Sequence, residues 1–326
     1  MMGNRPCHRP FGCPSGRPLD RPLSRPLTAL VVSVTLVALS GANCPNMVHQ
    51  FGAPRPRVLQ PGATIEQVLN VVNANNGRIQ SLSSTDASIS VPGSPTLRAN
   101  LAFCRPGLLR LRAKTALTGP ELDLGSNEEL FWFWVRRAEP PAVFYCRHAD
   151  YPDSAAQRMI PIDPAWLGDV LGAATLDPAL PHQGPYAMPG DRLQVRTVVE
   201  TVQGPMTRIT VVDAIGGAIV EQHVYDTAGG RVASAVVEQH RRDPLTNLVV
   251  PRVVKIDAPQ TQFQMRLDLG TVQVNRLDCA SQHLWTMPRI EGAPLVDLAH
   301  PPRMTPTSVP RSSAPPAALN RRRSVR

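Results

Sequence analysis

The sequence predicts a mainly β fold (α+β) built around one curved antiparallel sheet, as a barrel or a sandwich. Apolar and polar residues alternate in many of the stretches between residues 97 and 275, as they do in half-buried strands. Turn residues rich in glycine separate these stretches at short intervals, which is typical of barrels and sandwiches. Apolar residues at helical spacing are confined to short segments, so helices are expected only as additions to the sheet.

The chain of 326 residues begins with Arg-Pro repeats, which are followed by an uncharged apolar run at residues 27–39. Proline at every fourth position from Pro6 to Pro26 excludes a helix there. A basic stretch, a short apolar run and then small residues are the parts of a secretory signal. The run is too short to cross a membrane as a stable helix. We therefore predict a leader at residues 1–43 and an exported protein.

Two readings of the end of this leader stay open. Ser40-Gly41-Ala42 fits a small-x-small site with cleavage before Asn43. Alternatively, Cys44 is a candidate lipid anchor at the N-terminus of the mature chain, although Asn43 stands where a lipobox usually has a small residue. Either reading places the protein in the cell envelope, on the periplasmic side, and the second attaches it to a membrane.

The formal charge of +9 is concentrated at the two ends. Residues 1–43 hold five Arg and one Asp, and residues 300–326 hold six Arg and no acid, which leaves 23 Lys+Arg against 24 Asp+Glu for residues 44–299. A nucleic-acid-binding protein carries its positive charge on a folded face. Nucleic acid is therefore excluded as a partner, and residues 299–326, rich in Pro, Ser, Ala and Arg, are expected to be a disordered basic tail.

A short helix is expected to open the folded domain, which we place at residues 63–298. Residues 44–62 are rich in Pro, Gly and Arg and suit a linker. Thr64 is a candidate N-cap with Gln67 three residues later, and Asn75-Asn76-Gly77 ends the helix. Its apolar stripe consists of Ile65, Val68, Leu69 and Val72.

Strands are predicted from the alternating stretches that follow. Residues 97–103 and 109–113 form two half-buried strands, joined by a turn at residues 105–107. The run at residues 130–135 is aromatic on both faces, so it is either buried on both sides or lines a cavity. Further strands are predicted at residues 193–202, 207–213, 219–225, 232–239, 250–258, 263–269 and 271–275.

A second short helix is expected in the middle of the chain, at residues 161–172. Asp163 would cap it, Pro164 fits its first position and Gly172 would stop it. Such a segment would interrupt the sheet as a lid or plug.

Catalytic motifs do not match the chain. Gly-x-Ser-x-Gly, Gly-x-Gly-x-x-Gly, the Walker A pattern and paired Cys-x-x-Cys do not occur. Three histidines are interpreted as exposed or locally bonded: His223 and His240, on or beside predicted strands, and His148, two residues before Asp150. The acids near the aromatic run are interpreted as solvated loop residues: Glu121, Asp123, Glu128 and Glu129. We therefore predict no enzyme, no metal site and no cofactor.

Four cysteines remain after the leader, namely Cys44, Cys104, Cys146 and Cys279. A Cys104–Cys146 bridge is possible in an oxidising compartment, and a buried free thiol is the alternative.

The sequence of residues 105–111, together with residues 122–127 and the aromatic run at 131–134, resembles the LolA/LolB-type lipoprotein carriers, and in particular the divergent LolA-like outer-membrane lipoprotein-sorting proteins. Residues 164–167, 225–231 and 250–252 support the resemblance, which spans roughly residues 63–298. It implies a LolA/LolB-like half-open barrel with covering helices, whose inside holds acyl chains.

The function implied is that of a non-catalytic envelope protein that binds acyl chains of lipids or lipoproteins, as in lipoprotein sorting, with a membrane surface as a second partner through the anchor. The candidate cavity residues are Leu101, Phe103, Leu109, Leu111, Phe131, Phe133, Phe263, Met265 and Leu267. The same residues would equally fill an ordinary β core. The alternative is therefore a structural envelope lipoprotein with a filled core and no ligand, and an enzyme comes third.

Overall fold

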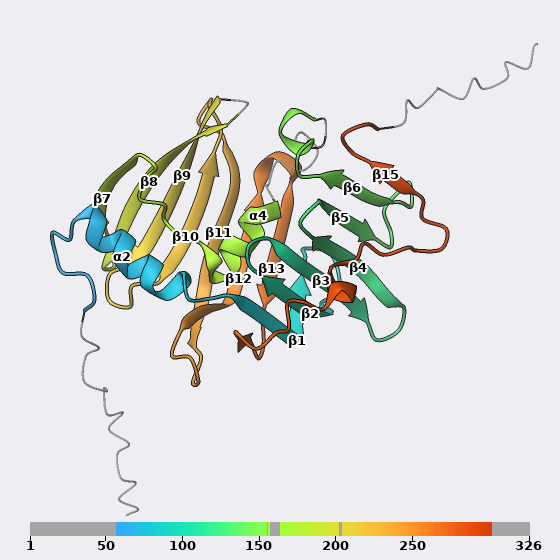
Figure 1. Cartoon of the computed structure of the whole chain (residues 1–326), viewed down its shortest axis with the longest axis horizontal. Helices are drawn as coiled ribbons and strands as arrows, with labels where there is room; N and C mark the ends of the chain where they lie inside the picture. The colour runs from blue at the N-terminus through green and yellow to red at the C-terminus, as the bar shows by residue number, and fades with distance from the viewer. Residues whose placement is uncertain (1–56, 155, 157–163, 202–203, 302–326) are drawn as a thin grey trace, which may run out of the picture. The chain divides into compact units, whose positions relative to one another are not determined.

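The structure is a computed structural model that describes residues 57–301, apart from 155, 157–163 and 202–203. The leader, Cys44, Asp163 and the basic tail beyond residue 301 lie outside the described residues. In the part of the chain described, fifteen strands form one curved sheet whose path ends at β7 and β15 without closing (Figure 1). The strand pairs are antiparallel, except that β15 runs parallel to β6. The predicted mainly β fold with one antiparallel sheet is confirmed.

Strand β1 (Ser81–Ser90) joins the two halves of the sheet, because it pairs with β2 on one side and with β13 on the other. The first half continues through β2 (Leu97–Cys104), β3 (Leu108–Thr115), β4 (Gly119–Ser126), β5 (Leu130–Val135), β6 (Val143–Arg147) and β15 (Leu295–Asp297). The second half is formed by β7 (His182–Met188), β8 (Arg192–Thr201), β9 (Gly204–Asp213), β10 (Ile219–Tyr225), β11 (Arg231–Arg242), β12 (Val249–Ala258) and β13 (Phe263–Asp268). The short β14 (Gln273–Val274) also pairs with β1.

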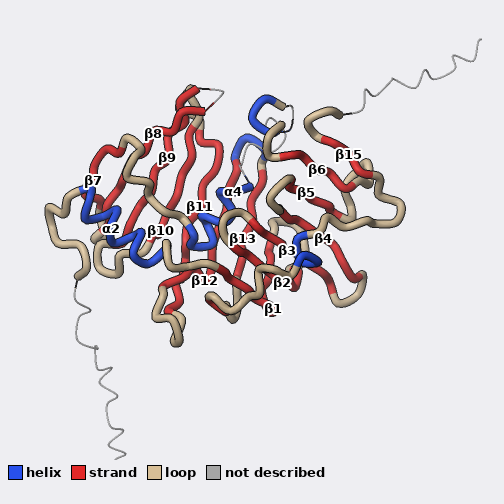
Figure 2. Tube along the Cα trace, in the orientation of Figure 1, coloured by secondary structure: helices blue, strands red, loops and turns tan. Residues whose placement is uncertain are grey.

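Little of the described part of the chain is helical, and Figure 2 shows the helical pieces as a few short segments against the sheet. Helix α2 (Ile65–Asn76) begins at the predicted cap, where the Gln67 amide donates to Thr64 Oγ1 and the Thr64 amide donates to Gln67 Oε1. Its buried residues include Val68, Leu69 and Val72 of the predicted stripe. The single-turn 3-10 helices are η1 (Tyr151–Asp153), η3 (Pro259–Thr261) and η4 (Gln282–Trp285).

The two faces of the sheet are distinguished by the strand register, because directly paired residues point to the same face. Leu101 pairs with Leu111, and on the other side of β1 Leu267 pairs with Val254. We call the face that carries these residues the inner face and the opposite one the outer face. The inner face carries the largest core cluster, whereas the outer face carries Arg110 and Trp132.

Of the two alternatives left open for the cysteines, the Cys104–Cys146 bridge is wrong, because Cys104 is bonded to Cys279, whereas Cys146 is a buried free thiol as the other alternative expected. Cys104 ends β2 on the outer face, whereas Cys146 of β6 pairs with Phe131 on the inner face. Four strand spacings separate β2 from β6, or about 19 Å, far beyond the Cα separation of about 7 Å that a disulfide can span.

The interpretation of Glu121 and Asp123 as solvated loop acids is also wrong. Both belong to β4 and both are 8% exposed. Asp123 is paired with Arg110 of β3, at 2.6 Å between Oδ2 and Nη2. The acids therefore belong to the structural interior of the first half of the sheet.

Candidate functional site

The inner face of the sheet is covered in its centre by a short segment of the chain, residues 164–176, which we call the plug. The plug consists of α4 (Pro164–Gly168), a single π-helical turn η2 (Asp169–Ala173) and an extended end. Trp166, Val170 and Leu171 are 1–3% exposed and pack in the same cluster as β1–β3 and β11–β13. The predicted short helix therefore exists from residue 164 and lies over the sheet.

Close packing against the sheet explains why two positions of the plug are occupied by glycine. A Cβ on Gly168 would lie 2.7 Å from the ring of Phe103, so only glycine lets the plug approach β2 this closely. Gly172 has φ of 105°, a backbone conformation that favours glycine, and a Cβ there would meet Pro251 at 2.7 Å. The plug is thus shaped to the surface it covers.

The structure brings most of the predicted cavity residues together beneath the plug. These are Leu101, Phe103, Leu109, Leu111, Met265 and Leu267, all buried in one cluster with Trp166 and Leu171. Phe131 and Phe133 lie on the same face in a neighbouring cluster, where Phe131 meets Tyr151 edge-on and Phe133 stacks on Phe144 at 5.0 Å. Phe263, at the start of β13, is 39% exposed.

Hydrogen bonds fasten one end of the plug to α2 and to the turn between β2 and β3. The Arg105 guanidinium donates to the carbonyl of Ala173 and also to that of Asn76, at 3.0 Å. Asn73 and Leu176 exchange two bonds of 2.8 Å, and Asn76 Nδ2 donates to the Ala174 carbonyl. Towards the other end, the Gln222 side chain donates to the Asp169 carbonyl at 3.2 Å.

Two hollows follow the seam between the plug and the second half of the sheet. The larger has about 470 Å³ of space free of protein atoms, which includes open solvent, and is lined by Trp166, Arg208 and Val224 among others. The smaller, about 280 Å³ on the same measure, includes Val170, Gln222 and His240 in its wall. Burial lowers the pKa of His240 against the opposing effects of its bond to the Ile219 carbonyl and of Asp213. The six predicted residues beneath the plug do not line either hollow.

A Ser-His-Glu set occurs on the sheet but lacks the surroundings of a hydrolase site. His223 lies 2.9 Å from Ser234 Oγ through Nδ1 and 3.1 Å from Glu221 Oε2 through Nε2. Ser234 is 6% exposed in the interior of the sheet, with β10 on one side and β12 on the other. A hydrolase needs an accessible nucleophile and free donors for an oxyanion. We interpret the set as a local hydrogen-bond chain.

The other histidines singled out from the sequence are locally bonded, as expected. His148 Nε2 lies 2.9 Å from the Asn127 carbonyl, and His240 Nε2 lies 2.9 Å from the Ile219 carbonyl. Among the described residues, no group of three His, Cys, Asp or Glu side chains could hold a metal ion. The same residues contain no helix of the length and apolar character needed to cross a membrane.

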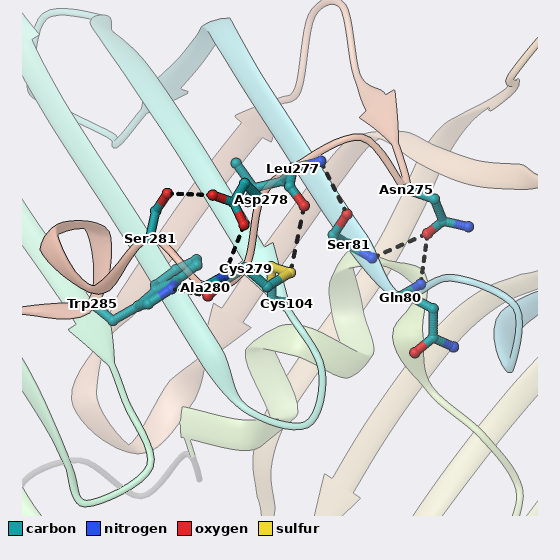
Figure 3. The surroundings of a disulfide bond; sticks show 10 residues. All are labelled: Gln80, Ser81, Cys104, Asn275, Leu277, Asp278, Cys279, Ala280, Ser281 and Trp285. Atoms are coloured by element: carbon teal, nitrogen blue, oxygen red, sulfur yellow. Dashed lines mark hydrogen bonds between the residues drawn. A yellow bond between two sulfur atoms is a disulfide. The ribbon is translucent and has the colours of Figure 1, made fainter.

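The outer face of β2–β6 has a different cover, which we call the strap, formed by residues 277–298. The Cys104–Cys279 disulfide ties it to β2, and Trp285 lies beside this bond with its indole donating to the Cys279 carbonyl at 3.0 Å (Figure 3). Arg110, 8% exposed, donates to the Leu284 and Thr286 carbonyls. The other end of the strap forms β15.

Aromatic residues of β5 belong to this outer layer as well. Trp132 and Trp134 are buried with Val143 against Met287 and Ile290 of the strap. The Trp132 indole donates to Asp123 Oδ1 at 3.1 Å, and the Arg110 guanidinium lies 5.1 Å from its ring centroid. The aromatic run is thus buried on both sides, as one of the two sequence-based alternatives expected.

Sequence reasoning missed the polar residues of the larger hollow, above all Arg208 and Asp169. Arg208 lies in an ordinary alternating strand, but Ile209, Val211 and Val212 are all apolar, so the pattern does not say which side of β9 faces inward. The face is fixed only by pairing, since Arg208 is opposite Thr197 of β8 and Val224 of β10.

No protein-family model and no curated protein matches the chain. Comparison with solved structures finds a domain assigned to outer-membrane lipoprotein sorting from Vibrio parahaemolyticus, with 9% identity and a TM-score of 0.44 over 68% of this chain and 100% of that one. A LolA superfamily protein from Nitrosomonas europaea has 8% identity and a TM-score of 0.43 over 69% and 98%. A DUF1329 family protein from Desulfovibrio piger has 11% identity and a TM-score of 0.43 over 68% and 98%.

Structures named for lipoprotein sorting and for the LolA superfamily, the family that the sequence resembles, are thus among those that the chain matches. At these identities and TM-scores the likeness says nothing about ligand or activity.

Proposed function

We propose that the protein is a non-catalytic binder of acyl chains, of lipids or lipoproteins, and that a chain enters the inner face of the sheet by displacing the plug. The observation that carries this proposal is the plug itself. An apolar sheet face that runs from Phe133 to Val254 is closed in its centre by one short, irregular segment, and hollows already follow the seam. Partly buried apolar side chains mark the rim of this closed region: Leu97, Leu122, Leu124, Leu167 and Val224.

Energetics favour exchange of the plug for an acyl chain. Each buried methylene contributes about 0.8 kcal/mol, so a dodecyl chain contributes at most about 9 kcal/mol. The plug side chains would leave an apolar surface that the acyl chain covers in turn, which keeps the net cost of opening small. The nine residues named from the sequence would then form the wall of the opened cavity.

Export and an envelope location form part of the proposal. The Cys104–Cys279 disulfide supports an oxidising compartment, where such bonds persist. Lipidation of Cys44 would hold the domain at a membrane surface, with a linker of residues 44–62 before it. Val58 and Leu59 in this stretch already bond to the carbonyls of Ile215 and Ala214.

The filled-core alternative is favoured by one observation, the tight packing of the predicted cavity residues beneath the plug. In that case the plug is a permanent part of the core, and the protein is a structural envelope protein without a ligand.

Native mass spectrometry of the full chain with dodecyl maltoside, below its micelle concentration, separates the two functions. We expect a one-to-one complex. Val224→Asn, which places an amide on the rim of the inner face, should weaken the complex about tenfold, because a buried polar group without a partner costs about 1–3 kcal/mol. Val236→Asn is the matched control, since Val236 is equally half-buried but pairs with Glu221 on the outer face.

Binding that falls for Val224→Asn and is unchanged for Val236→Asn supports the acyl-chain site. A protein that stays free of dodecyl maltoside at every concentration supports the filled core instead.

A further inference from the structure

Arg208 is the arginine that the sheet contributes to the wall of the larger hollow, which Asp169 and Asp177 also line. It pairs with Thr197 of β8 and with Val224 of β10, so its side chain lies on the inner face. The other inner-face residues of these strands that line the hollow are Thr197, Val199, Thr210, Gln222 and Val224. The Arg208 side chain is 42% exposed, so its guanidinium is accessible to a ligand from solvent.

The Arg208 guanidinium has donors to spare. Its nearest carboxylate oxygen is Asp169 Oδ2 at 3.7 Å, and within the described residues it forms no hydrogen bond. On the outer face, by contrast, Arg266 meets Glu238 at 2.8 Å and Arg192 meets Glu221 at 2.6 Å. Arginine carries five N–H donors in a planar fork that fits an anionic oxygen group.

A hydroxyl lies on the same face of β9 as this guanidinium and lines the same hollow. Thr210 is two residues further along β9, about 7 Å along the strand, and is 7% exposed. Its hydroxyl has no hydrogen-bond partner within the described part of the chain, whereas the Thr197 hydroxyl is bonded to His182 Nδ1 at 2.8 Å. Trp166 and Val224 line the same hollow with apolar surface. Donors and apolar surface thus meet in one hollow at the seam.

We infer that Arg208 and Thr210 form a subsite for the anionic headgroup of the bound amphiphile, a phosphate-class group, while the acyl chain passes between the plug and the sheet. This inference rests on the proposed function and names the class of ligand. Guanidinium binds phosphate through two parallel, charge-assisted bonds. Asp169 belongs to the plug and competes for the same cation, so a bound phosphate takes Arg208 away from the plug.

The test compares two amphiphiles with one chain length, dodecyl phosphate and dodecyl maltoside, by calorimetric titration of the full chain below their micelle concentrations. We expect dodecyl phosphate to bind more tightly. Arg208→Gln should weaken dodecyl phosphate about tenfold and leave dodecyl maltoside within about twofold, because only the charged headgroup loses its bonds. Asp169→Asn should strengthen dodecyl phosphate about threefold, since it removes the competing charge.

Arg266→Gln is the matched control, because its side chain is 45% exposed against 42% for Arg208 and it lies on the outer face. It should leave both affinities unchanged. An unaltered preference for dodecyl phosphate in Arg208→Gln overturns the headgroup subsite while leaving the proposed function in place. If neither amphiphile binds, the proposed function itself fails. Inorganic phosphate that binds through Arg208 without either amphiphile overturns a lipid headgroup as the source of the anion.

Discussion

The plug on the inner face and the strap on the outer face cover the same sheet by different means. The strap is tied to β2 by a disulfide, and the buried Arg110–Asp123 pair lies beneath it, with Arg110 donating to its carbonyls. The plug packs through Trp166, Val170 and Leu171, with hydrogen bonds from polar side chains to its backbone. Among the described residues, no disulfide and no ion pair with both side chains buried holds the plug.

This difference separates a fixed cover from an exchangeable one. Removal of the strap would require a covalent bond to break and would expose a charge pair to solvent, together with two tryptophans. Removal of the plug exchanges one set of apolar contacts for another when an acyl chain takes its place. The inner face is therefore the face on which binding is expected.

The largest effect is expected from Asp123→Ala, which breaks the pair beneath the strap. Arg110 would remain as a buried charge, and such losses cost about 3–5 kcal/mol in the free energy of unfolding. Urea denaturation measures the change. The double variant Arg110→Met with Asp123→Leu should recover most of it, because it leaves no unpaired charge. A loss below about 1 kcal/mol for Asp123→Ala would show that the strap does not depend on this pair.

The second largest effect is expected from loss of the Cys104–Cys279 bond. It should lower the free energy of unfolding by about 2–4 kcal/mol, because the bond closes a loop over a sequence separation of 175 residues. Dithiothreitol should lower the urea midpoint of the native chain and have no effect on the midpoint of a Cys104→Ala, Cys279→Ala variant. Amphiphile affinity at low urea should be unchanged, since the strap lies on the other face. A coupled loss of affinity would contradict the separation of the two covers.

Gly172→Ala should destabilise the plug by about 1–2 kcal/mol, because alanine is strained at a positive φ and its Cβ would press on Pro251. A loosened plug should raise the affinity for dodecyl maltoside. Gly229→Ala is the control, since Gly229 has φ of 80° with open space around its Cβ. Equal affinities in the two variants would argue that the plug is a permanent part of the core.

The smallest effect is expected on the stability of the protein at acidic pH, through Asp243. Burial raises the pKa of Asp243, but bonds from Thr246 and Leu245 and the charge of Arg276 outweigh it and hold the pKa below its ordinary 3.8. The carboxylate therefore contributes stability that is fully present above pH 3.8 and is lost as the pH falls through the lower folded-state value. Asp243→Asn should flatten this acid limb of the stability profile. An identical acid limb in both proteins would exclude Asp243 as its source.

Alternation and turn residues were enough to predict β8–β13 of the second half of the sheet, but β7 (His182–Met188) was not predicted. The range predicted at residues 219–225 coincides with β10, and the one at 250–258 differs from β12 by one residue. The alternation of apolar and polar residues does not predict β1. In this strand Ser81 and Ser84 are 3% exposed, and the Ser84 hydroxyl donates to the Leu269 carbonyl. A polar strand in the middle of a sheet has no apolar pattern to reveal it.

The roles of charged and sulfur-containing residues were harder to predict from the sequence, because these roles depend on which face of the sheet the residues occupy. Asp123 follows a Gly-Pro pair that is typical of loops, and its burial depends on the strap, which lies more than 150 residues later in the sequence. The partner of Cys104 depends on the same strap. Arg208 was missed because neither face of β9 is consistently polar in the sequence.

The central claim, that the plug and not the strap gives way to an acyl chain, is tested most directly by hydrogen exchange of the full chain with and without dodecyl maltoside. The account predicts that amphiphile speeds amide exchange in residues 166–173 and leaves residues 277–287 unchanged. Unchanged exchange in residues 166–173 on a chain that carries the amphiphile, or faster exchange in both segments, would contradict it.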